Sequence, residues 1–155
     1  MGRAPRHLAA GACYHVATKG NNDEPIFRDD WDRAVFVQLL RRVRRRYGWR
    51  LHASCLLGNH YHLLVETPLA NLSHGMRDLN GQYARAFNDR HGRKHHVFGR
   101  RFWSKEVESE EQYDQTLAYI VHNLVLGLSP LPPGDIWGYL ATAFAAVIAV
   151  QRVQA

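Results

Sequence analysis

Four short hydrophobic stretches, each bounded by turn-forming residues, predict four β-strands. The strands are expected at residues 13–18, 49–57, 60–66 and about 102–107. Only Gly58-Asn59 separates the second strand from the third, and this dipeptide is typical of a tight turn. The second and third strands are therefore expected to form a hairpin.

Apolar residues recur about every four positions in two longer segments, which predicts two amphipathic helices. The first opens at Asp29-Asp30, where acidic side chains favour the positive end of the helix dipole, and ends at Gly48. The second has Ser73 as its expected N-cap. The expected buried stripes are Trp31, Val35, Leu39, Val43 and Tyr47 on the first helix, and Leu72, Met76, Leu79, Tyr83 and Phe87 on the second.

A third helix is expected from about Ser109 to Val125, and a last helix at residues 135–152 follows a Pro-rich connector at residues 129–134. The element order β-α-β-β-α-β-α-α predicts an α+β fold, in which one antiparallel sheet has helices on one face and an extra C-terminal helix. This order resembles the ferredoxin-like or RNA-recognition-motif topology. A length of 155 residues fits one domain, spanning residues 1–155.

The chain carries 20 Lys and Arg against 14 Asp and Glu, a formal net charge of +6. This balance favours a polyanionic partner, either nucleic acid or an anionic membrane surface. The longest apolar run, residues 136–150, is shorter than the roughly 20 residues that span a bilayer. The first ten residues lack the apolar segment of a signal peptide, and Cys13 and Cys55 form no disulfide framework or zinc pattern. A reducing cytosol suits this composition.

The first candidate for chemistry is His60-Tyr61-His62 on the third predicted strand. Residues two apart on a strand point to the same face, so both imidazoles could converge on one metal ion. The chain has ten His, so random placement alone would produce such a pair about as often as not. The alternative is a half-exposed strand face without a ligand.

The second candidate is Tyr119 with Asn123 on the third predicted helix. A spacing of four places them one above the other, away from the apolar sector. They could also be a surface tyrosine beside a surface amide. Combined with the His pair and the basic charge, however, they fit phosphodiester chemistry, in which imidazoles and an amide oxygen hold a divalent cation while the phenol attacks phosphorus.

The chain resembles the IS200-like Y1 transposases of the HUH nuclease superfamily, and in particular the REP-associated tyrosine transposases. The resemblance runs from about Tyr14 to Phe144. It is carried by YHVATKGNN (14–22), IFRDD (26–30), RYGWRLHASCLLGNHYHLLVE (46–66), LNGQYARAFNDRHG (79–92), FGRRFWS (98–104) and YIVHN (119–123). The NHYHLLVE string and the Tyr-x-x-x-Asn helix, in this order, are the most specific of these matches.

The resemblance implies roles for the matching residues. His60 and His62 would hold Mg²⁺ or Mn²⁺, Asn123 would complete the metal site, and Tyr119 would be the nucleophile. Attack on single-stranded DNA near a hairpin would leave a 5′-phosphotyrosine and a free 3′-OH, and the reverse attack would rejoin strands without ATP. The resemblance also implies a monomer or a homodimer, with no membrane partner, in the cytoplasm and associated with the nucleoid.

The sequence departs from the family pattern after the tyrosine helix. The family usually continues Asn-Pro-Val-Arg-Ala, whereas this chain reads Asn-Leu-Val-Leu-Gly at residues 123–127. A Trp-Ser-Ser segment near the family's C-terminus is replaced by Trp-Gly-Tyr at residues 137–139. These changes could weaken recognition of the hairpin. They leave open a second hypothesis, in which the protein is a hairpin-binding module without catalytic activity. A third reading keeps the metal site but uses water as the nucleophile.

Basic residues outside these motifs are candidate DNA contacts. Arg100, Arg101 and Lys94 are in a Gly-punctuated loop, and Arg45 is on the first helix. An ordinary solvated face is the alternative, because amphipathic helices usually expose arginine. His15, on the first strand, could neighbour the metal site, but it is not included among the expected ligands.

Overall fold

An antiparallel sheet forms the centre of the computed structural model, which describes residues 8–127, with side chains through residue 123. Its strands are β1 (Ala12–Lys19), β2 (Arg50–Leu56), β3 (His60–Thr67) and β4 (Trp103–Val107), in the order β2-β3-β1-β4. This confirms the predicted α+β fold, and each strand begins and ends within two residues of its expected bounds. The expected connector at residues 129–134 and helix at residues 135–152 lie outside the described residues.

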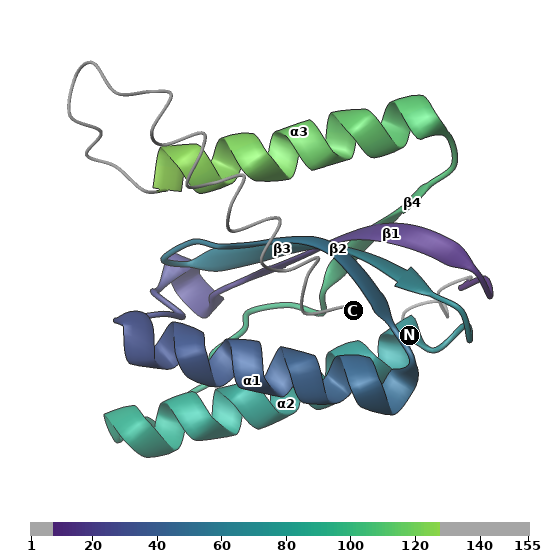
Figure 1. Cartoon of the computed structure of the whole chain (residues 1–155). Helices are drawn as coiled ribbons and strands as arrows, with labels where there is room; N and C mark the ends of the chain where they lie inside the picture. The colour runs from purple at the N-terminus through teal and green to yellow at the C-terminus, as the bar shows by residue number, and fades with distance from the viewer. Residues whose placement is uncertain (1–7, 128–155) are drawn as a thin grey trace, which may run out of the picture.

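Helices lie on both faces of the sheet (Figure 1). Two of them, α1 (Asp30–Tyr47) and α2 (Leu72–His91), pack side by side on one face, as expected. The third, α3 (Glu110–Gly127), crosses the opposite face and contacts β2, β3 and β4. The expected arrangement with helices on one face is therefore correct for α1 and α2 and wrong for α3. No helix within residues 8–127 combines the length and the hydropathy that would let it cross a membrane.

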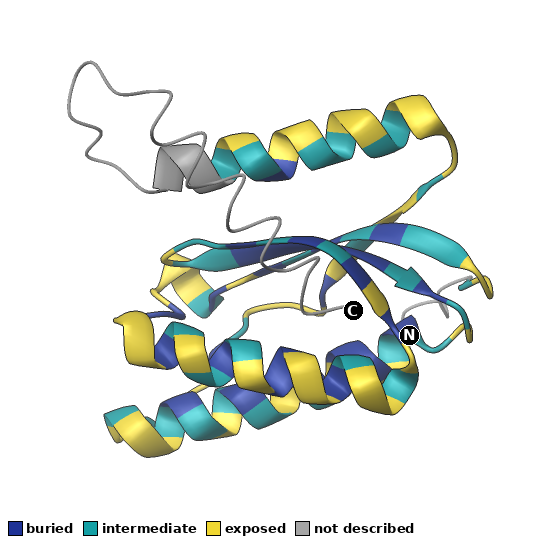
Figure 2. Cartoon of the chain, viewed as in Figure 1, coloured by how far each residue is buried: buried dark blue, intermediate teal, exposed yellow. Residues whose placement is uncertain are grey.

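Each face of the sheet has its own hydrophobic cluster (Figure 2). The larger cluster lies under α1 and α2 and takes Leu63 and Val65 from β3. The smaller one lies under α3, where Ile120 packs against Leu64 and neighbouring residues of β2. Alternate residues of β3 are thus buried on opposite sides, and α3 is held by the smaller of the two apolar patches.

The ends of α1 are as the sequence predicts, but its buried face differs. The side chain of Asp29 accepts a hydrogen bond from the backbone N–H of Asp32 at 3.0 Å, and Gly48 ends the helix in the left-handed conformation. Leu39 and Val43 are buried as expected. The prediction that Trp31 is buried is wrong, because Trp31 is 66% exposed and Asp32 beside it points inward.

All the residues of the predicted α2 stripe are buried. The prediction of Ser73 as N-cap is wrong, since Asn71 occupies that position. The Asn71 side chain makes no capping bond. Instead it accepts a hydrogen bond from Trp49 Nε1 and donates one to the carbonyl of Tyr47, both at 2.9 Å. Asn71 thus ties the start of α2 to the end of α1 and to the residue that precedes β2.

Substituting Gly75 by alanine should destabilise the protein by about 2 kcal/mol, because the new methyl group would overlap a rigid buried ring. A Cβ at Gly75 would lie 2.0 Å from Cζ2 of Trp49, whose indole is 4% exposed and held by Asn71. Gly81 on the same helix has nothing within 4 Å of such a Cβ and is the matched control. Urea unfolding of Gly81→Ala should show unchanged or higher stability. Equal losses in both variants would contradict the prediction.

Candidate functional site

His60 and His62 point toward α3 from the middle layer of the fold. They alternate with Tyr61, which is fully buried on the other side of the sheet against Phe36 of α1. The two imidazole centroids are 5.1 Å apart, with their planes at 85°. Strand alternation therefore presents both rings on the face that α3 covers.

Tyr119 of α3 lies over His62 of this pair. Its ring centroid is 5.5 Å from that of His62, and its side chain is 50% exposed. The position follows from the helix periodicity. Ile120, the next residue, is buried in the cluster under α3, so Tyr119 lies at the edge of the contact between the helix and the sheet. The phenol is thus beside the imidazoles and open to solvent.

His15 of β1 also belongs to this group of rings, as a neighbour that the sequence left open but did not include among the expected ligands. Its Nε2 is 3.0 Å from Nδ1 of His62, and its ring centroid is 5.7 Å from that of Tyr119. The pairing of β1 with β3 sets Ala17 opposite His62, which makes His15 a diagonal neighbour of His62 on the same face. The alternation along β1 could be predicted from the sequence, but the β1–β3 register that brings His15 next to His62 could not.

The free ring nitrogens of the pair suit a metal ion. Nδ1 of His60 is 2.7 Å from Oδ1 of Asn59, an amide oxygen that can only accept, so Nδ1 carries the proton and Nε2 keeps its lone pair. Nε2 of His62 is buried without a hydrogen-bond partner. Such an orphaned nitrogen is what a metal ligand looks like without its ion. The two residues therefore fit one half of a divalent cation site.

All three histidines are neutral near pH 7. Burial lowers the pKa of His62 to about 4, with smaller contributions from repulsion by His15 and His60 when those rings are protonated. Burial and Lys105 lower the pKa of His15, and burial and Lys19 lower that of His60. Neutral imidazole is the form that coordinates metals, so protons do not compete for these nitrogens at neutral pH.

A pocket of about 790 Å³ brings together some of the predicted site residues. His60, His62 and Tyr119 line it, as do Arg100 and Arg101. Asn123 does not line it; its side-chain amide donates to the carbonyl of Tyr119 at 2.9 Å. Among the described side chains, residues 8–123, no three or more His, Cys, Asp or Glu gather as a metal site. The third ligand expected at Asn123 is therefore turned toward its own helix.

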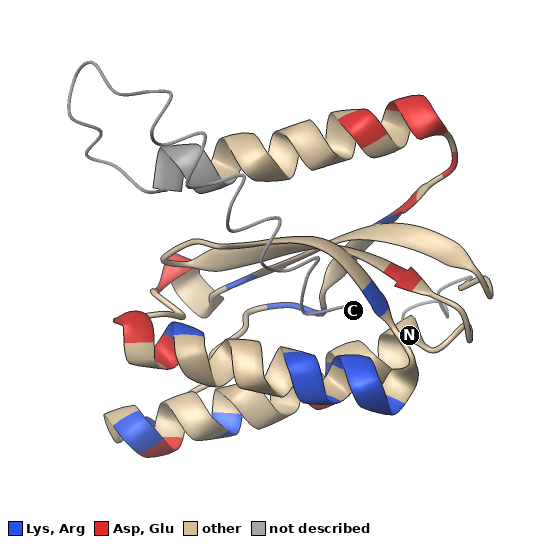
Figure 3. Cartoon of the chain, viewed as in Figure 1, with Lys and Arg blue, Asp and Glu red and all other residues tan. Residues whose placement is uncertain are grey.

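The other two basic candidates lie elsewhere. Lys94 is exposed and lines a separate pocket of about 810 Å³. Arg45 is exposed on α1, in the layer that the sheet separates from Tyr119. Lys and Arg gather in the C-terminal half of α1, whereas Asp and Glu mark the first turns of α3 (Figure 3). The structure thus brings Arg100 and Arg101 to the histidines and leaves Arg45 remote from them.

A polar chain fixes the first half of α3 over the sheet. The hydroxyl of Tyr113 is 2.8 Å from Nδ1 of His52, and Nε2 of His52 is 3.2 Å from Oε2 of Glu66. Glu66 also pairs with Arg50 at 3.3 Å. Together with the buried side chain of Ile120, these contacts determine where α3 holds Tyr119.

Comparison with known families gives a match over most of the chain. The family model described as "Transposase IS200 like" matches residues 9–123, which is most of the chain and includes the three histidines and Tyr119. A comparison with curated proteins finds no match.

Solved structures share the fold, and two of them are described below. The first is described as a REP-associated tyrosine transposase bound to a REP hairpin, with 19% identity and a TM-score of 0.67, covering 81% of this chain and 74% of that one. The second is a candidate transposase from Deinococcus radiodurans R1, with 20% identity and a TM-score of 0.54, covering 79% of this chain and 96% of that one. At these identities the likeness establishes the fold alone.

Proposed function

Because this chain belongs to the IS200-like transposase family, we propose that it cuts and rejoins single-stranded DNA near hairpins through a covalent bond to Tyr119. The observation that carries the proposal is the half-exposed phenol beside the orphaned Nε2 of the buried His62. A nucleophile must be reachable by a strand, and Tyr119 is reachable from the pocket that the two histidines line.

The chemical step is a transesterification. The phenol oxygen of Tyr119 attacks phosphorus, a Tyr–O–P bond forms, the P–O3′ bond breaks, and the proton lost by the phenol ends on the departing 3′ oxygen. The product is a 5′-phosphotyrosine with a free 3′-OH. A 3′-OH can reverse the step and restore the phenol, because each attack exchanges one phosphodiester bond for another and needs no ATP.

The other residues near Tyr119 would bind the metal ion and the DNA. Mg²⁺ or Mn²⁺ bound by His60 and His62 would offset charge on the scissile phosphate. Asn123, if it turned from the Tyr119 carbonyl, would add an oxygen ligand one helical turn from the nucleophile. Arg100 and Arg101 would hold the flanking phosphates.

The test is the covalent product itself. A hairpin oligonucleotide with unpaired flanks, labelled at either end in separate reactions, is incubated with the protein and Mg²⁺ or Mn²⁺ and run on a denaturing gel. We expect a protein–DNA adduct that carries the 3′-end label, because Tyr119 would be joined to the 5′ phosphate of the fragment on the 3′ side of the cut. The 5′-labelled fragment should be released with a free 3′-OH, and neither product should form with EDTA. Cutting without an adduct would indicate a water nucleophile, and tight binding without cutting would indicate a binding module; each would overturn the proposal.

His15 would act by orienting His62. A ligand at Nε2 of His62 requires the proton on Nδ1, which then donates to Nε2 of His15. His15→Leu should weaken Mn²⁺ affinity by about 10–100-fold, measured by calorimetry or by the EPR signal of free Mn²⁺ without DNA. His15→Gln, which keeps an acceptor, should recover part of it. The exposed His74 on α2 supplies the control His74→Leu, and equal losses in both leucine variants would contradict the role.

A further inference from the structure

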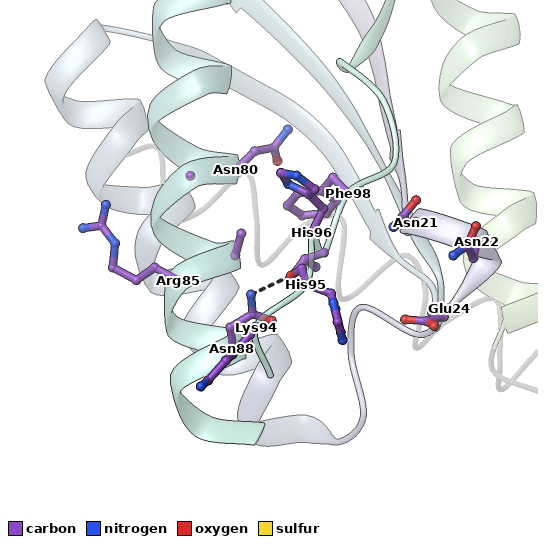
Figure 4. Close-up of a pocket in the computed structure, with 13 residues that line it drawn as sticks. Asn21, Asn22, Glu24, Asn80, Arg85, Asn88, Lys94, His95, His96 and Phe98 are labelled. Atoms are coloured by element: carbon purple, nitrogen blue, oxygen red, sulfur yellow. Dashed lines mark hydrogen bonds between the residues drawn. The ribbon is translucent and has the colours of Figure 1, made fainter. Parts of the chain in front are cut away.

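We propose that the second pocket binds one unpaired nucleotide of the DNA strand that runs through the site of Tyr119, an inference that rests on the proposed function. We name it the asparagine pocket, after the side chains that line it: Asn21, Asn22, Asn80 and Asn88. Its volume is about 810 Å³, and Phe98 lies in its wall (Figure 4).

One wall separates the asparagine pocket from the pocket of the histidines, because Asn21 and Asn22 line both. Hydrogen bonds hold this wall in place: the N–H of Asn21 donates to the carbonyl of Val97 at 2.8 Å, and Gly20 forms an isolated β-bridge with Phe98. The two segments are in close contact, since a Cβ at residue 99 would lie 3.1 Å from Cα of Asn21. A strand that leaves Tyr119 across this wall therefore enters a preformed cavity.

The lining has the chemistry of a base-binding site. Tyr61 donates from its buried hydroxyl to Oδ1 of Asn80, which orients the amide and leaves its NH₂ for a ligand. Asn21 and Asn22 lie across the pocket from Asn80 in this view, with Phe98 between them (Figure 4). Amides offer both donors and acceptors to a base edge, and an aromatic ring offers a stacking surface to any base.

The charge at the rim suits the phosphate of the same nucleotide. Arg85 and Lys94 are exposed and line the pocket. The one acidic lining residue, Glu24, is paired with Arg93 at 2.8 Å. The rim therefore keeps a net positive charge next to an uncharged, hydrogen-bonding interior, which is the pattern expected for a nucleotide rather than for a cation or a purely apolar ligand.

The first experiment locates the base. Binding of a hairpin with unpaired flanks is measured by fluorescence anisotropy in EDTA with Tyr119→Phe, and each unpaired nucleotide is replaced in turn by an abasic one. We expect a single position at which the abasic nucleotide weakens binding about tenfold. In Phe98→Leu the same replacement should cost less than about twofold, since the stacking partner is already gone. The absence of any position whose effect depends on Phe98 would overturn the proposal.

The second experiment tests the rim with charge-matched variants. Arg85→Ala/Lys94→Ala should weaken binding of the flanked hairpin about tenfold and lower its salt slope by about 1.4, while hardly affecting a blunt hairpin. Arg41→Ala/Arg42→Ala removes the same charge from the exposed side of α1, away from both pockets, and is the control. Equal losses in the two double variants would overturn the proposal.

The nucleotide site and the proposed chemistry can fail separately. The same oligonucleotide is tested for adduct formation with the wild-type protein and Mn²⁺. If an adduct forms but no abasic replacement has an effect that depends on Phe98, the nucleotide site is overturned and the transesterase activity stands. If one abasic replacement has an effect that depends on Phe98 but no adduct forms, the transesterase activity is overturned and the pocket stands as a DNA-binding site. If the protein binds neither the flanked nor the blunt hairpin, both the nucleotide site and the proposed transesterase activity are overturned.

Discussion

Tyr119→Phe is expected to abolish the covalent protein–DNA product while leaving the fold and DNA affinity intact. The change removes one oxygen from a half-exposed side chain and keeps the ring that lies 5.5 Å from His62. Loss of a nucleophile that forms the covalent bond should lower the rate by more than about a thousandfold. The measurement is single-turnover adduct formation on the labelled hairpin, with affinity determined in EDTA.

The matched control is Tyr113→Phe, six residues earlier on the same helix. It removes the hydrogen bond to His52 and should cost about 1 kcal/mol of stability. The adduct should still form, at a lower rate if α3 is less firmly held. Tyr61 and Tyr83 are fully buried and cannot reach a strand. A full adduct yield from Tyr119→Phe, or its loss from Tyr113→Phe alone, would contradict the assignment of the nucleophile.

The features predicted well from the sequence are those governed by local periodicity. Alternation along β3 places His60 and His62 on one face and Tyr61 on the other, and this needs no knowledge of other strands. Gly48 ends α1 in the left-handed conformation that favours glycine, which is a property of one residue. Such rules act within a few residues, so the sequence carries them directly.

The features missed depend on partners far along the chain. His15 meets His62 only through the β1–β3 register, 47 residues apart in sequence. The spacing of apolar residues along α1 also could not show that Asp32 is buried and Trp31 is exposed. Burial of a carboxylate is favourable only when a cation from elsewhere in the fold pairs with it. That cation is Arg90, at the end of α2, and His91 beside it also contacts the carboxylate.

Asp32→Ala should destabilise the protein by about 2–3 kcal/mol, because it removes a buried carboxylate and leaves the groups that donate to it without their acceptor, although Arg90 keeps its pair with Asp29. Asp32 is 2% exposed. It accepts hydrogen bonds from the backbone N–H of Arg28 at 2.8 Å and from Arg90 at 2.7 Å, and it pairs with His91 at 2.9 Å. Urea unfolding at pH 7 measures the loss.

The control is Asp30→Ala, at an exposed carboxylate on the same helix turn that pairs with Arg33 at 3.4 Å. An exposed pair of this kind contributes less than about 1 kcal/mol, so this variant should stay close to the wild type. Equal losses in the two alanine variants would show that Asp32 acts only through helix capping charge and not as the buried link between α1 and α2.

The same link should make stability depend on pH in the acid range. Burial alone would raise the pKa of Asp32, but the hydrogen bonds from Arg28, Arg90 and His91 outweigh it and lower the pKa below its ordinary 3.8. A lowered folded-state pKa means that the stabilisation is complete above the unfolded-state value and is lost as the pH falls through the folded-state one. Wild-type stability should therefore fall below about pH 4 more steeply than that of Asp32→Asn, which has no proton to take up. Parallel acid curves for the two proteins would mean that other carboxylates carry the acid sensitivity.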